Sequence, residues 1–195
     1  MKNTLRHYSL TLLIFISFNS SCFSQKVGNN KIESTNTISW KKDVKLKKSD
    51  FMGKIDTLSA HVAQTGANII VIPYALVKGK YQYQILAKFY KEKSWLNTNS
   101  DTYNDILKHE QLHFDIAELY ARKMRKKVYE TKLANNVVLE SDYRRIHKTL
   151  FQEYTNFQKE YDSQTGNSRK KDIQIQWEML ISKKLKELEK FSLTI

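Results

Sequence analysis

Proline, glycine and cysteine are scarce in this chain of 195 residues, which contains one Pro, five Gly and one Cys. Because Pro and Gly most often interrupt helices and strands, we expect long regular elements. The single cysteine, Cys22, excludes a framework of intramolecular disulfides. Apolar residues make up 41% of the chain and charged residues 27%, which is the composition of a globular protein rather than a disordered one.

The chain also lacks an apolar stretch that is long enough to span a membrane. The apolar run near the N-terminus, Leu10–Phe18, is shorter than the roughly 20 residues that a transmembrane helix needs. It follows Lys2 and Arg6 and precedes small residues, which is typical of an export signal over residues 1–24; a membrane-anchoring N-terminus is the alternative. We therefore expect an exported protein, periplasmic or secreted, or a lipoprotein if Cys22 is lipidated.

The chain is strongly basic, with 33 Lys and Arg, 20 Asp and Glu and a net charge of +13. Removal of residues 1–24 takes away Lys2 and Arg6 and no acid, so the charge falls from +13 to +11. Such a charge can attract nucleic acid, anionic lipid or acidic polymers. The lysines are scattered, without a basic arm or a stacking motif, so we expect a solvated surface and no specific nucleic-acid partner. An anionic envelope surface is the alternative partner.

A polar linker, residues 25–37, is predicted to precede one domain, residues 38–195. Two segments in its first half are rich in β-branched or alternating residues. These predicted strands are Ile69–Tyr74 and Tyr81–Tyr90, joined by a hairpin turn at Val77–Lys80.

The pattern becomes helical after Ser94, where Ser100 or Asp101 can cap a helix. Three helices are predicted, and one clear loop, residues 162–168, lies between the last two. They cover about Thr102–Leu133, Glu140–Tyr161 and Lys170–Phe191. Strands first and helices later indicate an α+β fold, with an N-terminal antiparallel sheet and about three long helices.

The first of these helices carries an HExxH motif, HEQLH at residues 109–113. His109 and His113 are one turn apart, so they project from one face and can hold one zinc ion. Glu110 flanks that face, where it can accept a proton from a water whose pKa the zinc has lowered. The alternative is a pair of core histidines satisfied by hydrogen bonds. The apolar stripe of the helix includes both histidines, and the neighbouring glutamate and export signal favour the metal.

A third ligand must come from another element. At about 100° per residue, Glu118 lies roughly 180° from His109 and Asp115 roughly 120° away, and Arg122 points outward. Candidates in the later helices and loop are Asp162, Glu153, His147 and residues 163–168. Glu153 is interpreted as a surface charge and His147 as structural. Asp162 is favoured because it is predicted to end a helix and begin a loop. His61, in the strand region, is expected on the surface.

These residues resemble a bacterial family known as domain of unknown function 922, whose members are labelled as secreted zinc proteases with a zincin-like active-site helix. The segment from His109 to Ile116 (HEQLHFDI) is similar to its main motif. The likeness covers about residues 38–185 and includes further motifs in order. These are LKKSDFMGK at 46–54, KSW at 93–95, YDSQT at 161–165, and Gln174 with Trp177.

The chain departs from this family at one position. The YDxxT motif continues there as xHG, whereas this chain has Asn167 where the histidine is expected. Asparagine is a poor zinc ligand but can donate a hydrogen bond to an oxyanion. The resemblance implies Asp162 as a metal-site residue and Tyr161 or Asn167 as supports for the transition state.

Together these patterns predict an exported zinc metallopeptidase, a hydrolase acting on a peptide or protein substrate. Zn²⁺ would be held by His109 and His113 with Asp162, and Glu110 would be the general base. The alternative is a catalytically weak or inactive zinc-binding protein of the cell envelope, a hypothesis that Asn167 motivates.

Overall fold

The computed structural model describes residues 36–59, 61–77, 80–97 and 103–193, all within one unit, Glu33–Ile195. The predicted export signal with Cys22 and nearly all of the linker lie outside the described residues. So do the candidate caps Ser100 and Asp101 and the centre of the predicted hairpin turn. The predicted domain boundaries and the fate of Cys22 stay predictions.

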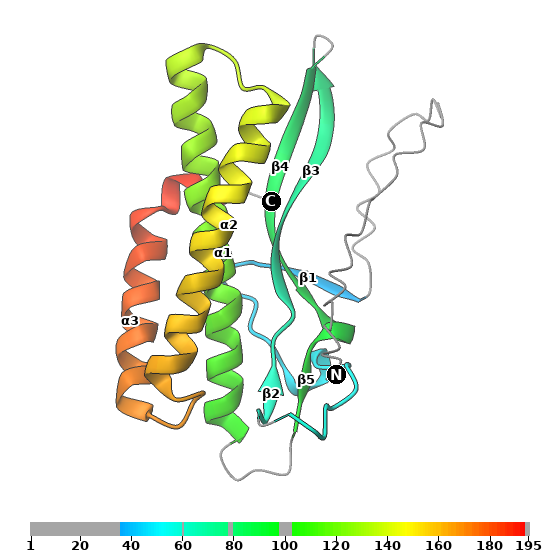
Figure 1. The fold of residues 1–195 in the computed structure, drawn as a ribbon, viewed down its shortest axis with the longest axis vertical. Coiled ribbons are helices and arrows are strands. Elements are labelled where there is room, and N and C mark those ends of the chain that lie inside the picture. The colour runs from blue at the N-terminus through cyan, green and yellow to red at the C-terminus, as the bar shows by residue number, and fades with distance from the viewer. Residues whose placement is uncertain (1–35, 60, 78–79, 98–102, 194–195) are drawn as a thin grey trace, which may run out of the picture. The chain divides into compact units, whose positions relative to one another are not determined.

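A three-stranded antiparallel sheet forms the N-terminal part, in the order β1–β4–β3 (Figure 1). Its strands are β1, Thr37–Ser39, β3, Ala67–Val77, and β4, Lys80–Tyr90. The two long strands confirm the predicted hairpin. Strand β3 is longer than predicted at both ends, whereas β4 begins one residue earlier and ends at Tyr90 as predicted. Pro73 lies in edge strand β3 beside a register shift between Pro73 and Ala75, where a residue without an N–H disturbs few ladder hydrogen bonds.

Two short strands make a second antiparallel pair beside the helices: β2, Ala63–Gln64, and β5, Trp95–Leu96. The turns η1, Lys48–Asp50, and η2, Lys91–Lys93, flank this region. Gly53 donates its N–H to the carbonyl of Ser94 at 2.7 Å, and a Cβ on Gly53 would lie 2.8 Å from that oxygen. This close approach requires glycine and ties the segment around Gly53 to the start of β5.

Three long helices follow, which confirms the α+β class. They are α1, Tyr103–Asn135, α2, Glu140–Thr165, and α3, Lys171–Glu187, which is followed by the turn η3, Glu189–Phe191. No helix among the described residues is long and apolar enough to cross a membrane.

The end of α2 differs from the prediction. The helix continues to Thr165, so Asp162 lies in its last turn rather than at the start of a loop. Gly166 then ends the helix in the left-handed conformation, with φ 60°, and its N–H reaches back to carbonyls of the last turn. The Thr165 hydroxyl donates to the carbonyl of Tyr161, one turn earlier in the helix.

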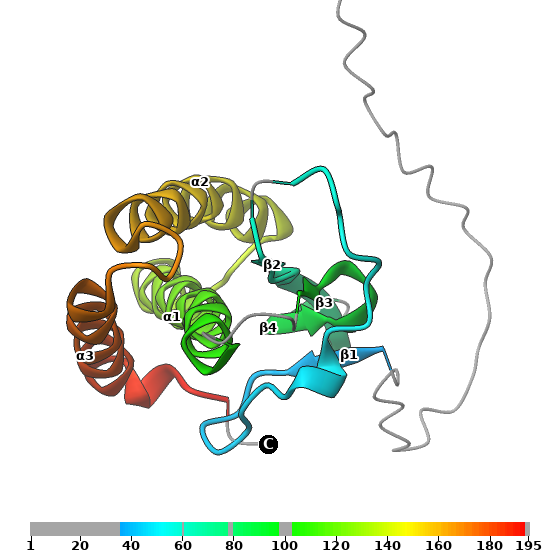
Figure 2. The same cartoon turned by 90° about the horizontal axis from the view of Figure 1, so that it is seen from below.

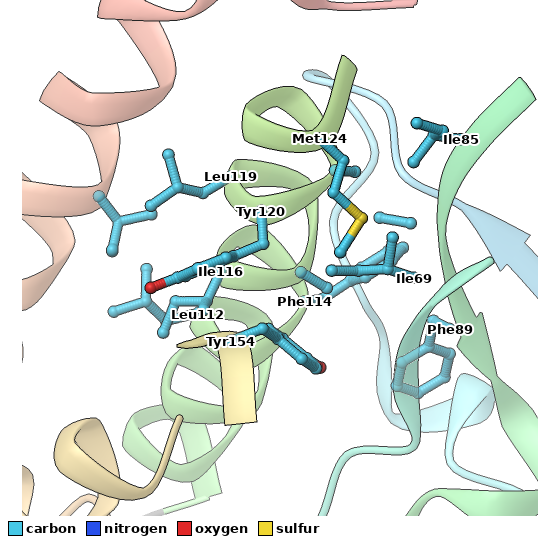
Figure 3. Packing of buried hydrophobic residues seen from close by; sticks show 14 of the residues in the cluster. Ile69, Ile85, Phe89, Leu112, Phe114, Ile116, Leu119, Tyr120, Met124 and Tyr154 are labelled. Atoms are coloured by element: carbon cyan, nitrogen blue, oxygen red, sulfur yellow. The ribbon is translucent and has the colours of Figure 1, made fainter. Parts of the chain in front are cut away.

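Helix α1 lies at the centre of the fold, with strands β3 and β4 on one side and α2 and α3 on the others (Figure 2). Phe114 and Met124 of α1 are fully buried on the side of the sheet, beside Ile69 and Phe89 (Figure 3). Leu119 is fully buried on another side of the same helix. The core therefore surrounds α1 instead of lining one stripe of it.

This central position corrects the expectation that Arg122 points outward. Arg122 is only 1% exposed and Glu118 only 3% exposed. Arg122 pairs with Glu118 and with Glu189, and its guanidinium lies 5.2 Å from the centroid of the Trp40 ring. Helix α3 and η3 cover this face, and a buried charge needs such partners.

Candidate metal centre

Three side chains from two helices meet at one point. The Nε2 atoms of His109 and His113, one turn apart on α1, lie 3.2 Å from each other. The Oδ1 atom of Asp162, in the last turn of α2, lies 3.1 Å from the first of these nitrogens and 2.9 Å from the second. Among the described residues, these three form the one group of His, Cys, Asp and Glu that could hold a metal ion.

The geometry of this triad fits a tetrahedral metal ion. Zinc bonds to His nitrogen and carboxylate oxygen are about 2.0–2.2 Å long, so neighbouring ligand atoms of a tetrahedral site are separated by about 3.3 Å. The three observed separations, 2.9, 3.1 and 3.2 Å, are close to this value. The group of His109, His113 and Asp162 could therefore hold a metal ion, with the fourth position left for water or substrate.

Each imidazole is oriented by the side-chain oxygen of a glutamine, which contacts the Nδ1 atom of the ring. The Nδ1 atom of His109 lies 3.2 Å from Gln174 Oε1, and that of His113 lies 2.6 Å from Gln158 Oε1. Each contact leaves Nε2 facing the shared point. Metal-binding histidines commonly donate their other ring N–H to an oxygen in this way. The Tyr161 ring stacks on His109, with centroids 4.5 Å apart.

The electrostatics of the triad favour the ionised form of Asp162 and the protonated form of His113. Burial by itself would raise the pKa of Asp162, but hydrogen bonds from His109 and His113 outweigh it and hold the pKa well below its usual range. Burial would lower the pKa of His113, but the Asp162 hydrogen bond and the charge of Glu110 outweigh it and raise the pKa. The triad thus stabilises positive charge at its centre.

The triad faces a cavity of about 390 Å³, large enough for part of a peptide. Glu110 lines the same cavity and is 5% exposed. In the described part of the chain, no hydrogen bond or salt bridge engages its carboxylate. Because no buried side-chain oxygen of the described residues lacks a partner, the oxygens of Glu110 are not fully enclosed by protein and are open to the cavity. Glu110 is therefore placed to accept a proton from a molecule bound in the cavity.

One wall of the cavity comes from residues 61–65, which include β2. The Thr65 hydroxyl donates to the carbonyl of Glu110 at 3.3 Å and ties this wall to α1. His61 is exposed, as expected for a surface residue, but it also lines the cavity. Asn167 and Ser168 also line the cavity, and their φ angles are 53° and 71°. Consecutive non-glycine residues in this conformation are uncommon and often mark functional sites.

Other predicted candidates lie elsewhere. His147 contacts the carbonyl of Ile69 and stacks on Phe151, away from the triad. Glu153 is exposed, in a separate groove between the helices. Tyr161 is completely buried behind His109, where its hydroxyl donates to Gln174 Oε1 at 2.7 Å, and it does not line the cavity. This position suits support of His109 rather than contact with a substrate.

The sequence reasoning missed Gln158 and gave Gln174 no role. One signal for Gln158 was present, since it lies one turn before Asp162 and so shares a face of α2 with it. No such spacing links Gln174 to the histidines. It lies 65 residues from His109 and reaches it only because α3 packs against α1.

Comparison with known families covers the part of the chain that holds this centre. Residues 86–170 match the model of a family described as "Bacterial protein of unknown function (DUF922)". The match includes His109, Glu110, His113, Asp162 and Asn167, whereas residues 46–54 and Gln174 lie outside it. No curated protein and no solved structure matches the chain. The resemblance predicted from the motifs is confirmed: over residues 86–170, this chain is similar to that bacterial family of unknown function.

Proposed function

We propose that this protein is an exported, zinc-dependent metallopeptidase. The observation that carries the proposal is the position of Glu110. Its carboxylate makes no hydrogen bond among the described residues and is open to the cavity that the triad faces. The triad supports zinc because two imidazoles and one carboxylate are ligands of catalytic zinc sites. A bound zinc ion would lower the pKa of water and polarise a carbonyl group.

The residues of the chain would divide the remaining tasks. Glu110 would accept a proton from the attacking water and pass it to the nitrogen that leaves. Residues 63–65 would align an extended peptide along β2, which pairs only with β5 within the described residues. Asn167 would donate a hydrogen bond from its amide to the developing oxyanion.

The test of this function uses the purified protein with zinc and a mixed peptide library. We expect about one zinc per chain and hydrolysis that a chelator abolishes and added zinc restores. Glu110→Gln should keep the zinc and lose at least about 100-fold in turnover, since general base catalysis contributes about 10²–10⁴-fold. Glu130→Gln is the matched control, because it removes the same charge from an exposed position on the same helix. Equal activity in Glu110→Gln and wild type would refute the role of Glu110.

A second candidate function is a zinc-binding envelope protein without turnover. Asn167 favours this second candidate, because the family that the motifs resemble has a histidine at the matching position. Such a protein would bind zinc through the same triad and hydrolyse no peptide in the library. Asn167→His separates the two candidates, since a gain of hydrolysis would show that the asparagine limits the activity.

A further inference from the structure

The β3–β4 hairpin carries a group of exposed apolar side chains near its end, in residues 74–77 and 80–82, which we call the hairpin tip. Leu76 and Tyr81 are cross-strand partners there and are 63% and 57% exposed. Tyr74 is 63% exposed and Val77 49% exposed. Single apolar side chains on a surface are ordinary, but several gathered at one place mark a site of interaction.

The hairpin tip lies beside the start of α2 and near the end of α1 (Figure 1). The ring centroid of Tyr81 is 6.3 Å from that of Tyr83, which is 4.7 Å from the ring centroid of Tyr143 in the first turn of α2. Leu139, which precedes that turn, is 52% exposed. The hairpin is therefore held against α2 as far as Tyr83, and Leu139 enlarges the apolar surface at this end of the molecule.

Exposed apolar side chains occupy both faces of the hairpin tip. Successive residues of a strand point to opposite faces, so Leu76 and Val77 lie on different faces, and both are exposed. A protein partner packs against one face of a hairpin, whereas a lipid surface surrounds an inserted tip. Tyrosine suits a lipid surface, because its ring is apolar and its hydroxyl can stay in contact with water. The distribution of these side chains therefore favours a membrane over a protein partner.

The charged side chains around this end have an excess of positive charge. Residues 126–148, at the end of α1 and the start of α2, include six Lys and Arg but three Asp and Glu. Each of the three acids pairs with a Lys or Arg of the same segment. Lys80, Lys132 and Lys148 are exposed and make no ion pair among the described residues. Their charge is complementary to anionic lipid headgroups.

We propose that the hairpin tip, with Leu139 and the three lysines, binds the surface of an anionic lipid bilayer. The apolar side chains of the tip enter the headgroup region, and the ammonium groups of Lys80, Lys132 and Lys148 lie near the lipid phosphates. A few apolar side chains and a basic surface give reversible binding rather than permanent insertion. The contact is therefore peripheral.

This surface is far from the metal centre. Glu140 begins α2 beside the hairpin and Asp162 lies in the last turn of the same helix. At 1.5 Å per residue, the 22 residues between these positions span about 33 Å. The binding of lipid thus leaves the cavity of the triad clear of the bilayer, and the proposal holds whether or not the protein is a peptidase.

The test measures sedimentation of the protein with vesicles of phosphatidylglycerol and phosphatidylcholine. The protein is used without residues 1–24, so that the apolar run near the N-terminus cannot bind lipid; all described residues lie within the compact unit Glu33–Ile195. We expect binding that increases with the share of phosphatidylglycerol and decreases with salt. Absence of binding to the anionic vesicles would overturn the proposal.

Two pairs of substitutions test the apolar contact. Leu76→Thr with Tyr81→Thr should weaken binding at least about tenfold, because it removes apolar area while threonine keeps a preference for strands. The control is Ile175→Gln with Met179→Gln on α3, where the side chains are 56% and 69% exposed, and it should bind like the wild type. Equal effects of the two pairs would overturn the proposal.

A charge variant tests the lysines in the same assay. Lys80→Gln with Lys148→Gln should weaken binding about tenfold or more, since each basic residue near an anionic surface contributes about fivefold. The control is Lys48→Gln with Lys54→Gln. Lys48 lies over the ring of Tyr103, at the opposite end of α1, so this pair should have the smaller effect. A larger loss in the control pair would place the lipid contact elsewhere and overturn the proposal.

A gain of binding excludes loss of the fold as the cause. Tyr81→Trp should bind the anionic vesicles more tightly, because the larger ring of tryptophan contributes more apolar area at the same interface. Sedimentation without lipid tests a second copy of the chain as the occupant. A dimer that Leu76→Thr with Tyr81→Thr dissociates would assign the hairpin tip to self-association and overturn the proposal.

Discussion

Replacement of Asp162 by alanine tests the metal centre most directly. The substitution removes the one ligand that comes from α2 and leaves His109 and His113 in place on α1. We expect zinc affinity to fall about 100-fold or more, because loss of an outer partner alone costs about 10–100-fold. The metal centre should then no longer connect α1 to α2.

The effect on thermal stability follows from mass action. A ligand present at 100 times its dissociation constant stabilises the native state by about 2.7 kcal/mol. For a domain of about 150–250 residues, each kcal/mol shifts the melting temperature by about 2–4 °C, so zinc should raise that of the wild type by about 5–11 °C. At the same zinc concentration, a 100-fold weaker variant gains about 0.4 kcal/mol, which corresponds to a shift of about 2 °C or less.

The assay is thermal unfolding with and without zinc, with each shift taken from the variant's own metal-free baseline. That baseline depends on pH. The pKa of Asp162 is lowered in the native state, so its contribution to stability is lost as the pH falls through that lowered value. The pKa of His113 is raised, so its contribution is lost as the pH rises through that raised value. Measurements above the histidine range remove most of this ion-pair effect from the comparison.

The control is Glu160→Ala, which removes an exposed carboxylate from the same helix and should leave the zinc shift intact. A full zinc shift in Asp162→Ala would refute the reasoning, because a cation held by His109, His113 and Asp162 cannot be indifferent to the loss of one of them. The stabilising cation would then be bound elsewhere on the chain.

Three further substitutions test the fold around the site. Glu118→Gln removes the charge that Arg122 and Arg125 share in the interior, and should cost about 3–5 kcal/mol of unfolding free energy in urea titrations; a loss below 1 kcal/mol would contradict a buried ion network. Gly53→Ala places a Cβ 2.8 Å from two backbone oxygens, so urea unfolding should show a loss of about 1–3 kcal/mol, and an unchanged midpoint would contradict that contact. Burial raises the pKa of Asp115, so the native state binds the proton of Asp115 more tightly than the unfolded chain does. The contribution of Asp115 to stability therefore falls as the pH rises from the ordinary pKa of an aspartate through the raised pKa. Asp115→Asn should flatten the stability curve at pH values above the ordinary pKa of an aspartate. An unchanged curve would show that other groups cause this slope.

Much of the site could be predicted from the motif alone. The spacing of His109 and His113 determines that they share one face of a helix, and the adjacent Glu110 lies beside that face for the same reason. Asp162 was selected from several candidates, and the structure brings it within 3.1 Å of both histidines. The reason given for it was incomplete, because Asp162 reaches the site from inside the last turn of α2 and not from a loop.

The opposite face of α1 could not be predicted in the same way. A helical wheel assigns a residue to a direction but does not say what lies there. Arg122 points away from the metal face as expected, yet it is buried, because α3 and η3 pack on that side and supply Glu189 and the carbonyl of Leu185. The helical wheel placed Arg122 on the polar side of α1, and Arg122 was therefore expected to be exposed. A charged side chain with partners of opposite charge can nevertheless be buried.

By itself, the sequence determined the local geometry: the long helices and the hairpin, the pairing of His109 with His113, and the place of Glu110 next to them. These features depend on periodicities of a few residues, which the chain encodes directly. Only the tertiary structure decided which distant side chains complete the site. Asp162 and Gln174 lie 53 and 65 residues from His109, and their contacts with it depend on how α2 and α3 pack around α1. That packing is determined by burial of apolar surface over the whole core, which no local spacing contains.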